Sequence, residues 1–354
     1  MSKPPTIPPL PAALRDSRFM RACRREPVDM TPVWLMRQAG RYMKEYRDVR
    51  EKVAFKDLCR RPELAAEVAV TAQKKLGVDA GIVFSDILLI LEAMGAGLEY
   101  VEGEGPVVSQ GVTAPADAER LKVADPEALR YVYDAVRQTR AALPPNVPLI
   151  GFSGAPFTLA AYLIDGHGAR EAEKTRLFMR QHPDAWGALL EKLVKGLTGY
   201  LWRQAASGAQ ALQIFDTWVG VLGPRDYRQY VLPHMRTLVA ELPTGVPAIY
   251  FGTGTAGILD AMVECEPEVI GVDSRTDLGA AWARCGAVAI QGNLDSTVLF
   301  ADPATIRRAA QNVLDSAAGR PGHVFNLGHG VLPGTPVDNV RLLVDTVHEA
   351  SSRM

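Results

Sequence analysis

Cysteine is scarce in this chain of 354 residues. Only Cys23, Cys59, Cys265 and Cys285 occur, none in a Cys-x-x-Cys pair and none in a Cys/His cluster with zinc-finger spacing. Scattered thiols of this kind are typical of reduced, structural cysteines. We therefore expect a cytoplasmic protein without a structural zinc site.

Long apolar runs are also missing. No stretch approaches the ~18 apolar residues that a membrane span requires, so we expect no membrane association. The first 14 residues lack the apolar core of a signal peptide and instead carry five prolines. We predict a flexible, proline-rich lead-in over residues 1–14 and a single domain over residues 15–354.

The chain has no surplus of either charge. Its 39 Lys and Arg and 40 Asp and Glu give a formal net charge of −1, which predicts no general attraction to nucleic acid. An anionic ligand would need cations gathered locally. Of the 39 basic residues, 29 are arginine, an excess that we attribute mainly to base composition rather than to carboxylate recognition.

Eight short apolar runs alternate with helical patterns. Most are continuously apolar, as expected for parallel strands buried on both faces. The runs cover residues 33–36, 81–84, 149–152, 211–215, 248–251, 269–272, 288–291 and 324–327. Apolar residues recur at helical spacing over residues 61–76, 126–142, 186–206, 224–242, 258–264, 278–283 and 303–318.

This alternation predicts a (β/α)8 TIM barrel as one domain of the α/β class. A doubly wound open sheet is the alternative. That fold often carries a glycine-rich phosphate loop after its first strand, whereas the segment Arg37–Arg41 reads RQAGR here.

In a barrel, functional residues lie where strands end. Asp86, Asp216 and Asp273 each follow an apolar run, although any of them could simply cap a helix. His329 stands between two glycines, which offer it backbone freedom rather than packing, so we favour a functional role. Arg37 and Arg41 flank Gly40 after the first run.

Several catalytic motifs are missing. The chain has no H-E-x-x-H, no nucleophile elbow and no phosphate loop, and we expect neither a metal nor a cofactor. The remaining arginines, carboxylates, tyrosine, hydroxyl and histidine suit a polyanionic organic ligand.

Two long motifs carry a family resemblance. Residues 32–47 (PVWLMRQAGRYMKEYR) and 151–166 (GFSGAPFTLAAYLIDG) resemble the two signatures of the uroporphyrinogen decarboxylase family. Shorter matches are FSDIL at 84–88, FDTWVG at 215–220 and NLGHG at 326–330. The resemblance runs from about residue 15 to the C-terminus.

The resemblance implies a TIM barrel, usually a homodimer, that acts in heme and tetrapyrrole biosynthesis. The implied enzyme removes the four acetate carboxyls of uroporphyrinogen III as CO₂ and yields coproporphyrinogen III, without metal or organic cofactor. Its implied partners are the tetrapyrrole and a second copy of the chain.

The resemblance also implies roles for individual residues. Asp86 matches the aspartate that accepts from the pyrrole N–H groups, and Arg37 and Tyr162 are further catalytic candidates. The identity of the proton donor stays open. The implied substrate-binding set is Arg37, Gln38, Ala39, Gly40, Arg41, Asp86, Tyr162, Thr217 and His329. Thr217 replaces a serine common in the family and keeps the hydroxyl.

Two other functions compete. Zinc-dependent methyltransferases of the same superfamily need a His-x-Cys after a middle strand and a Cys near the last one. Residues 250–252 (YFG) and His329 stand at the matching places, which disfavours that reading. A non-catalytic tetrapyrrole carrier would keep the arginines but has no need for Asp86.

Overall fold

A computed structural model describes residues 6–101, 105–168 and 171–353. Seven parallel strands form one curled sheet in the order β1-β4-β5-β6-β7-β8-β9. They are β1 (Gly81–Ile82), β4 (Leu149–Gly154), β5 (Ala211–Asp216), β6 (Ala248–Gly252), β7 (Val269–Gly271), β8 (Ala289–Gln291) and β9 (His323–Val324). These strands fall on seven of the eight predicted runs.

The remaining run closes the barrel. Val33 forms a single parallel bridge with Phe325, and the Asp79 amide donates to the Val33 carbonyl at 2.8 Å. The segment that begins at Pro32 therefore lies between the last strand and the first, as the eighth stave of the barrel. The TIM-barrel prediction is confirmed, with the difference that this segment makes an isolated bridge rather than a regular strand.

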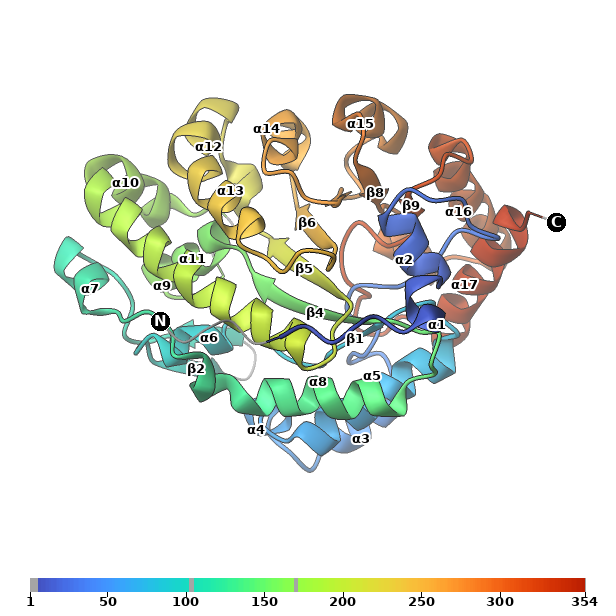
Figure 1. Cartoon of the computed structure of the whole chain (residues 1–354), viewed down its shortest axis with the longest axis horizontal. Helices are drawn as coiled ribbons and strands as arrows, with labels where there is room; N and C mark the ends of the chain where they lie inside the picture. Colours follow the sequence, from blue (N-terminus) through green and yellow to red (C-terminus); the bar gives the residue numbers. More distant parts are fainter. Residues whose placement is uncertain (1–5, 102–104, 169–170, 354) are drawn as a thin grey trace.

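The helices surround the sheet, and α2 lies at one end of it beside β9 (Figure 1). Before β4 lie α1 (Ala12–Arg15), α2 (Arg18–Cys23), α3 (Lys44–Arg50), α4 (Phe55–Cys59), α5 (Pro62–Leu76), α6 (Leu89–Ala93), α7 (Pro115–Arg120), η1 (Pro126–Leu129) and α8 (Arg130–Ala142). Then follow α9 (Pro156–Asp165), α10 (Glu173–Gln181), α11 (Pro183–Ala206), η2 (Val219–Val221), α12 (Pro224–Tyr230), α13 (Leu232–Ala240), η3 (Thr255–Gly257), α14 (Leu259–Val263), α15 (Leu278–Cys285), η4 (Ser296–Phe300), α16 (Pro303–Ala317) and α17 (Val337–Ser351).

All seven predicted helical segments are helical, with one interruption. The segment predicted over 224–242 divides into α12 and α13 at Val231, whose backbone is not helical. Pro233 explains the division, because proline lacks an N–H group and tolerates only the first turn of a helix. None of the helices within the described residues is long and apolar enough to cross a membrane.

One small sheet was not predicted. Strands β2 (Leu98–Val101) and β3 (Gly105–Val108) pair antiparallel, and their connection falls outside the described residues. The hairpin is fastened to the barrel through the Val108 amide, which donates to the Gly166 carbonyl at 2.7 Å. It brings Tyr100 toward the carboxyl end of β1, as described below.

The core has two layers. Inside the barrel, alternate strand residues such as Ile150, Ala211 and Ile249 pack together, and Phe19 and Met20 of α2 join them. The other face of each strand packs against the helices and forms the larger cluster. Such alternation is required because each strand points successive side chains to opposite faces.

The described part of the lead-in lies against the barrel. Residues 6–11 run to α1 along the amino ends of β4, β5 and β6 (Figure 1), and Ile7 and Leu10 pack on the core. Together with α8 they enclose a cavity of about 850 Å³. Residues 1–5 lie outside the described part, so the predicted flexible lead-in stays a prediction.

A buried chain of polar side chains runs along the outside of β5 and β6. Asp216 is fully buried and accepts from the Thr158 hydroxyl at 2.7 Å and the Tyr250 hydroxyl at 2.8 Å. The Tyr250 and Tyr227 hydroxyls are 3.2 Å apart, and Tyr227 lies 3.5 Å from the Cys265 sulfur. The chain thus connects the carboxyl end of β5 to the loop after α14.

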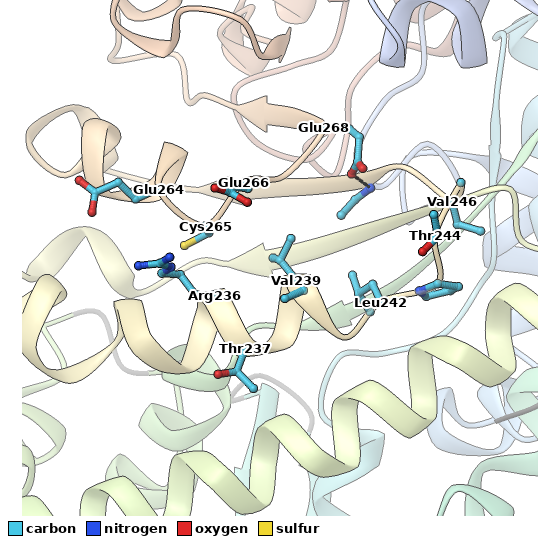
Figure 2. A pocket seen from close by; sticks show the side chains of 14 residues that line it. Arg236, Thr237, Val239, Leu242, Thr244, Val246, Glu264, Cys265, Glu266 and Glu268 are labelled. Carbon is cyan, nitrogen blue, oxygen red and sulfur yellow. Dashed lines mark hydrogen bonds between the residues drawn. The ribbon is translucent and has the colours of Figure 1, made fainter. Parts of the chain in front are cut away.

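Cys265 also lines a cavity of about 460 Å³ between α13 and the segment that leads into β7 (Figure 2). Arg236, Glu264 and Glu266 line the same cavity, and the Ala248 amide donates to Glu268 at 2.8 Å. The cavity opens at the amino end of the strands, opposite to the end where the predicted site residues lie.

Replacing Asp216 by Asn should change how stability depends on pH. Burial raises the pKa of Asp216 to about 6, although its hydrogen bonds with Thr158 and Tyr250 oppose the rise. The folded state therefore binds the proton more tightly than the unfolded chain, whose pKa is near 3.8. This contribution to stability is complete below the unfolded pKa and is lost as pH rises to about 6.

The variant lacks this titration. We therefore expect the unfolding free energy of Asp216→Asn minus that of the wild type to increase by about 2 kcal/mol when the pH is raised from 4.5 to 7.5. Urea denaturation of both proteins at each pH measures the difference. An equal difference at the two pH values would contradict the assignment.

Candidate active site

The predicted site residues gather at the carboxyl end of the barrel. Arg37 follows the closing segment, Asp86 follows β1, Thr217 follows β5 and His329 follows β9, while Tyr162 lies on α9 after β4. Because parallel strands end at the same edge, elements far apart in sequence deliver these side chains to one mouth.

Arg37 is held in an unusual backbone conformation. Its φ is +60°, although it is not a glycine. The preceding Met36 is bound on both sides, because its amide donates to the Asn326 side chain at 3.0 Å and its carbonyl accepts from Val331 at 2.9 Å. The exposed Arg37 side chain is thereby directed from a fixed point at the mouth.

The following residues form a tight turn. Gln38 is 1% exposed, and its amide group accepts from Leu35 at 3.0 Å and donates to the Ala80 carbonyl at 3.1 Å. A Cβ on Gly40 would lie 2.9 Å from the Arg37 carbonyl, so the turn itself requires glycine. Ala39 packs on the core.

Arg41 is exposed at the far side of this turn, where its carbonyl accepts from Arg47 at 3.0 Å. The Gln38 side chain is committed to the fold, and its predicted contact with substrate stays a prediction. Arg37 and Arg41 are the two members of the turn that offer side-chain charge to a ligand.

Asp86 is partly buried below the mouth. One carboxylate oxygen accepts from the Leu88 amide at 2.8 Å, the local turn that a capping role would also produce. Burial raises the pKa of Asp86, whereas the Leu88 amide, the Tyr100 hydroxyl and the Arg37 charge oppose that rise. The carboxylate thus stands in a desolvated place with Arg37 as its nearby cation.

Tyr100 was not among the sequence-predicted residues. Its hydroxyl is buried beside Asp86, its ring lies 4.8 Å from that of Phe55, and burial together with the Asp86 charge raises its pKa. It belongs to the hairpin strand β2, whose four residues carry no recognisable motif. No sequence signal available from one chain would have identified it.

Tyr162 faces the same carboxylate from α9. Burial and the Asp86 charge raise the pKa of Tyr162, while Arg37 acts in the opposite direction. Its ring lies 6.1 Å from the Trp218 ring. At neutral pH the phenol is therefore protonated and can donate a hydrogen bond.

Aromatic side chains form the floor. The Phe215 ring lies 5.7 Å from Phe152 and 6.2 Å from Phe251, with edge-to-face geometry. The three rings come from neighbouring strands on the inside of the barrel. An apolar floor under a charged rim suits a flat ligand whose charges lie at its periphery.

His329 stands between two glycines that serve close packing. A Cβ on Gly328 would lie 2.0 Å from the Ser274 nitrogen, and one on Gly330 would lie 2.4 Å from the Arg37 Cδ. Neither glycine has a positive φ. The expectation that they supply backbone freedom is therefore wrong, because they make room for Ser274 and for the Arg37 stem.

The ring of His329 is neutral at ordinary pH. Desolvation at the ring and the adjacent Arg37 charge hold the pKa of His329 below its usual value, although the residue is exposed, while a backbone hydrogen bond with Gly330 and the Asp273 charge oppose them. His329 can thus both donate and accept hydrogen bonds near Arg37.

The other strand-end groups differ in role. Thr217 is partly buried at the end of β5, and its carbonyl accepts from the Thr253 hydroxyl. Asp216 and Asp273 are both buried and are hydrogen-bonded to neighbouring elements. The Arg37 charge acts on Asp86, Tyr162 and His329, and the Asp86 charge acts on Tyr162, so Arg37 is the member of the set that the other three share.

The set can bind carboxylates and stabilise a cation. Within the described residues, no group of three or more His, Cys, Asp or Glu side chains is arranged to hold a metal ion. Two exposed guanidinium groups, two neutral donors and a desolvated carboxylate over an aromatic floor remain for chemistry.

Comparison with known proteins agrees with this chemistry. The sequence profile described as "Uroporphyrinogen decarboxylase (URO-D)" matches residues 14–350. A "Uroporphyrinogen decarboxylase" from Sorangium cellulosum is 52% identical over 94% of this chain and 95% of the relative. A protein of the same name from Roseiflexus sp. is 48% identical over 95% of this chain and 99% of the relative.

Among solved structures, a "methyltransferase from Methanosarcina mazei" superimposes with a TM-score of 0.80 over 94% of this chain and 97% of that one. At 23% identity this likeness shows a common fold. The family profile and the two relatives decide the assignment, since each spans nearly the whole chain. The chain belongs to the uroporphyrinogen decarboxylase family.

Proposed function

We propose that this chain decarboxylates the four acetate side chains of uroporphyrinogen III to methyl groups and releases coproporphyrinogen III in tetrapyrrole biosynthesis. The observation that carries the proposal is the carboxylate of Asp86 at the carboxyl end of the barrel, which is fixed by the Leu88 amide and feels the Arg37 charge. The relatives named above support it.

The reaction needs an electron sink. Protonation of a pyrrole ring at an α-carbon makes an iminium-like cation, and the acetate on the neighbouring carbon then loses CO₂ as its bonding electrons enter the ring. A proton added to the resulting methylene gives the methyl group, and the ring proton is lost. Each turnover therefore consumes one proton and releases one CO₂.

Asp86 is suited to stabilise the cation. Its carboxylate is fixed by the Leu88 amide and lies in a desolvated place, where a prepositioned charge acts strongly on charge that develops in the transition state. The pyrrole N–H groups would donate to it. Tyr162 and Tyr100 are both protonated and feel the charge of this carboxylate.

Arg37 and Arg41 are suited to bind carboxylates. Guanidinium groups recognise carboxylates in a bidentate manner and are poor acids at neutral pH. We therefore assign Arg37 to binding the acetate that reacts, and leave protonation to a group other than its guanidinium. His329 and Thr217 would donate to further carboxylates at the rim.

We further propose a cytoplasmic homodimer. The four cysteines are buried as free thiols, and burial raises the pKa of Cys265 to about 12 and of Cys285 to about 11, so these thiols are unreactive. The dimer is inferred from the family resemblance. The net charge of −1 predicts no general attraction to nucleic acid, so the cations that bind an anionic substrate have to be local.

The direct test is product analysis. Uroporphyrinogen III incubated anaerobically with chelator-treated protein should lose its acetate carboxyls in succession and end as coproporphyrinogen III, resolved by HPLC after oxidation. Unchanged substrate, together with methyl-transfer activity after zinc addition, would favour the methyltransferase class instead.

Removing the carboxylate of Asp86 should separate catalysis from binding. Asp86→Gly and Asp86→Asn should lower kcat by about 100-fold or more, because a prepositioned electrostatic partner of the transition state is lost. Binding of coproporphyrinogen III, measured by equilibrium dialysis under anaerobic conditions, should stay within a few-fold of wild type. Wild-type turnover in both variants would remove Asp86 from the mechanism.

Removing either guanidinium of the turn should weaken substrate binding. Arg37→Ala and Arg41→Ala should each raise KM by about tenfold, the size of one charge-assisted contact, and Arg37→Ala should also lower kcat. Lys44→Ala is the matched control, because Lys44 is an exposed cation near the turn that is paired with Asp48 at 2.6 Å. Equal KM values for all three variants would rule out a carboxylate clamp at the turn.

A further inference from the structure

A third arginine stands at the carboxyl end of the barrel, in the loop after β7. The Nε and Nη2 atoms of Arg275 each lie 3.1 Å from one carboxylate oxygen of Asp273. The Arg275 side chain is nevertheless 73% exposed. Within the described residues its Nη1 atom has no hydrogen-bond partner, so one end of the guanidinium is open to a ligand.

The anchor of this arginine is rigid. The Asp273 side chain is 3% exposed and accepts from the Gly254 amide at 2.7 Å and the Thr276 hydroxyl at 2.8 Å. The Asn293 amide in turn donates to the Asp273 carbonyl at 2.8 Å. Because these bonds fix the loop and the Nε end of the guanidinium, binding an anion would cost little ordering entropy.

The order of the strands places Arg275 across the mouth from Asp86. In the closed barrel the closing segment precedes β1, and β7 comes four positions after β1 among eight staves. Arg37 and Arg41 stand on the side of the closing segment. Arg275 therefore supplies positive charge from a stave three positions away from the closing segment that carries the two turn arginines.

His329 connects the two sides. The Gly328 backbone next to it packs against Ser274, the residue before Arg275, and the Asp273 charge acts on the imidazole. Arg37 acts on the same imidazole. The rim thus carries cations on both sides of a neutral histidine.

Neutralising Asp273 does not by itself explain Arg275. The buried carboxylate already accepts from an amide and a hydroxyl, and an ion pair with so exposed a partner contributes little to stability. The open end of the guanidinium can instead bind one of the carboxylates that a tetrapyrrole carries around its periphery.

We propose that Arg275 binds a peripheral carboxylate of the substrate on the side of the barrel opposite to Asp86. The proposal rests on the proposed function, since it takes the ligand to be a polyanionic tetrapyrrole. Arg275 follows β7, four staves from β1, whose end carries Asp86. It therefore determines how tightly and in which orientation the macrocycle is held, and not the rate of decarboxylation.

Steady-state kinetics with uroporphyrinogen III tests the assignment. Arg275→Ala should raise KM about fivefold, as expected for one exposed charge-assisted contact, and leave kcat within twofold of wild type. Arg275→Lys keeps the charge but cannot hold Asp273 and a second carboxylate at once. Its KM should therefore lie between that of the wild type and that of Arg275→Ala.

The matched control is Arg284→Ala. Arg284 is 41% exposed and paired with Asp260 at 3.0 Å, but α15 ends there and leads into the amino end of β8. Its loss removes the same net charge away from the mouth, and KM should not change.

An unchanged KM in Arg275→Ala, or a fall in kcat without a rise in KM, overturns the proposal for Arg275. The proposed function is unaffected by either result as long as the wild type decarboxylates the substrate. An equal rise in KM for Arg275→Ala and Arg284→Ala also overturns it, because the effect would then be general attraction. If the wild type itself does not decarboxylate the substrate, the proposed function fails, whatever the variants do.

Discussion

The site depends on how the barrel is closed. The segment from Pro32 to Met36 meets its neighbours through few backbone hydrogen bonds, of which the bond between the Phe325 amide and the Pro32 carbonyl, at 2.8 Å, is one. Side chains supply the rest. Asp79, whose side chain is 10% exposed, accepts from the Val33 amide at 2.7 Å, from Arg18 at 3.0 Å and from His348 at 2.7 Å. One carboxylate thus ties the closing segment to α2 and α17, and Arg37 begins where that segment ends.

This closure explains what the sequence could and could not predict. Apolar runs located all eight staves, because a strand buried on both faces must be apolar throughout. They did not show that the first stave is held by Asp79 and Asn326 in place of a regular ladder, because such bonds join residues some 46 and 290 positions apart. The apolar pattern of a segment indicates its burial, but it contains no information about hydrogen bonds to segments that are distant in the sequence.

The same limit applies to the site. The ends of the runs identified Asp86 and His329, and the turn after the first run identified Arg37, because parallel strands must deliver their ends to one mouth. Tyr100 was not predicted as a site residue, because it comes to Asp86 from a hairpin outside the barrel. Asp216 and Asp86 look alike in sequence, yet one faces the helices with both oxygens bonded and the other faces the mouth. Successive residues of a strand point to opposite faces, so the face on which each aspartate lies depends on the exact residue at which its strand ends. The apolar runs do not fix that residue.

The charge of Arg37 connects these parts. It opposes the desolvation of Asp86, which favours the carboxylate, and it also helps to keep His329 neutral. Arg37 therefore acts on both groups in the direction that the proposed chemistry needs, toward an anion at Asp86 and toward a neutral donor at His329, although burial has the larger influence on each pKa. In the proposed mechanism, a substrate carboxylate that neutralises Arg37 weakens its support of the Asp86 anion. The cation that forms on the pyrrole then takes over that support, so Asp86 is held most strongly when the transition state is present.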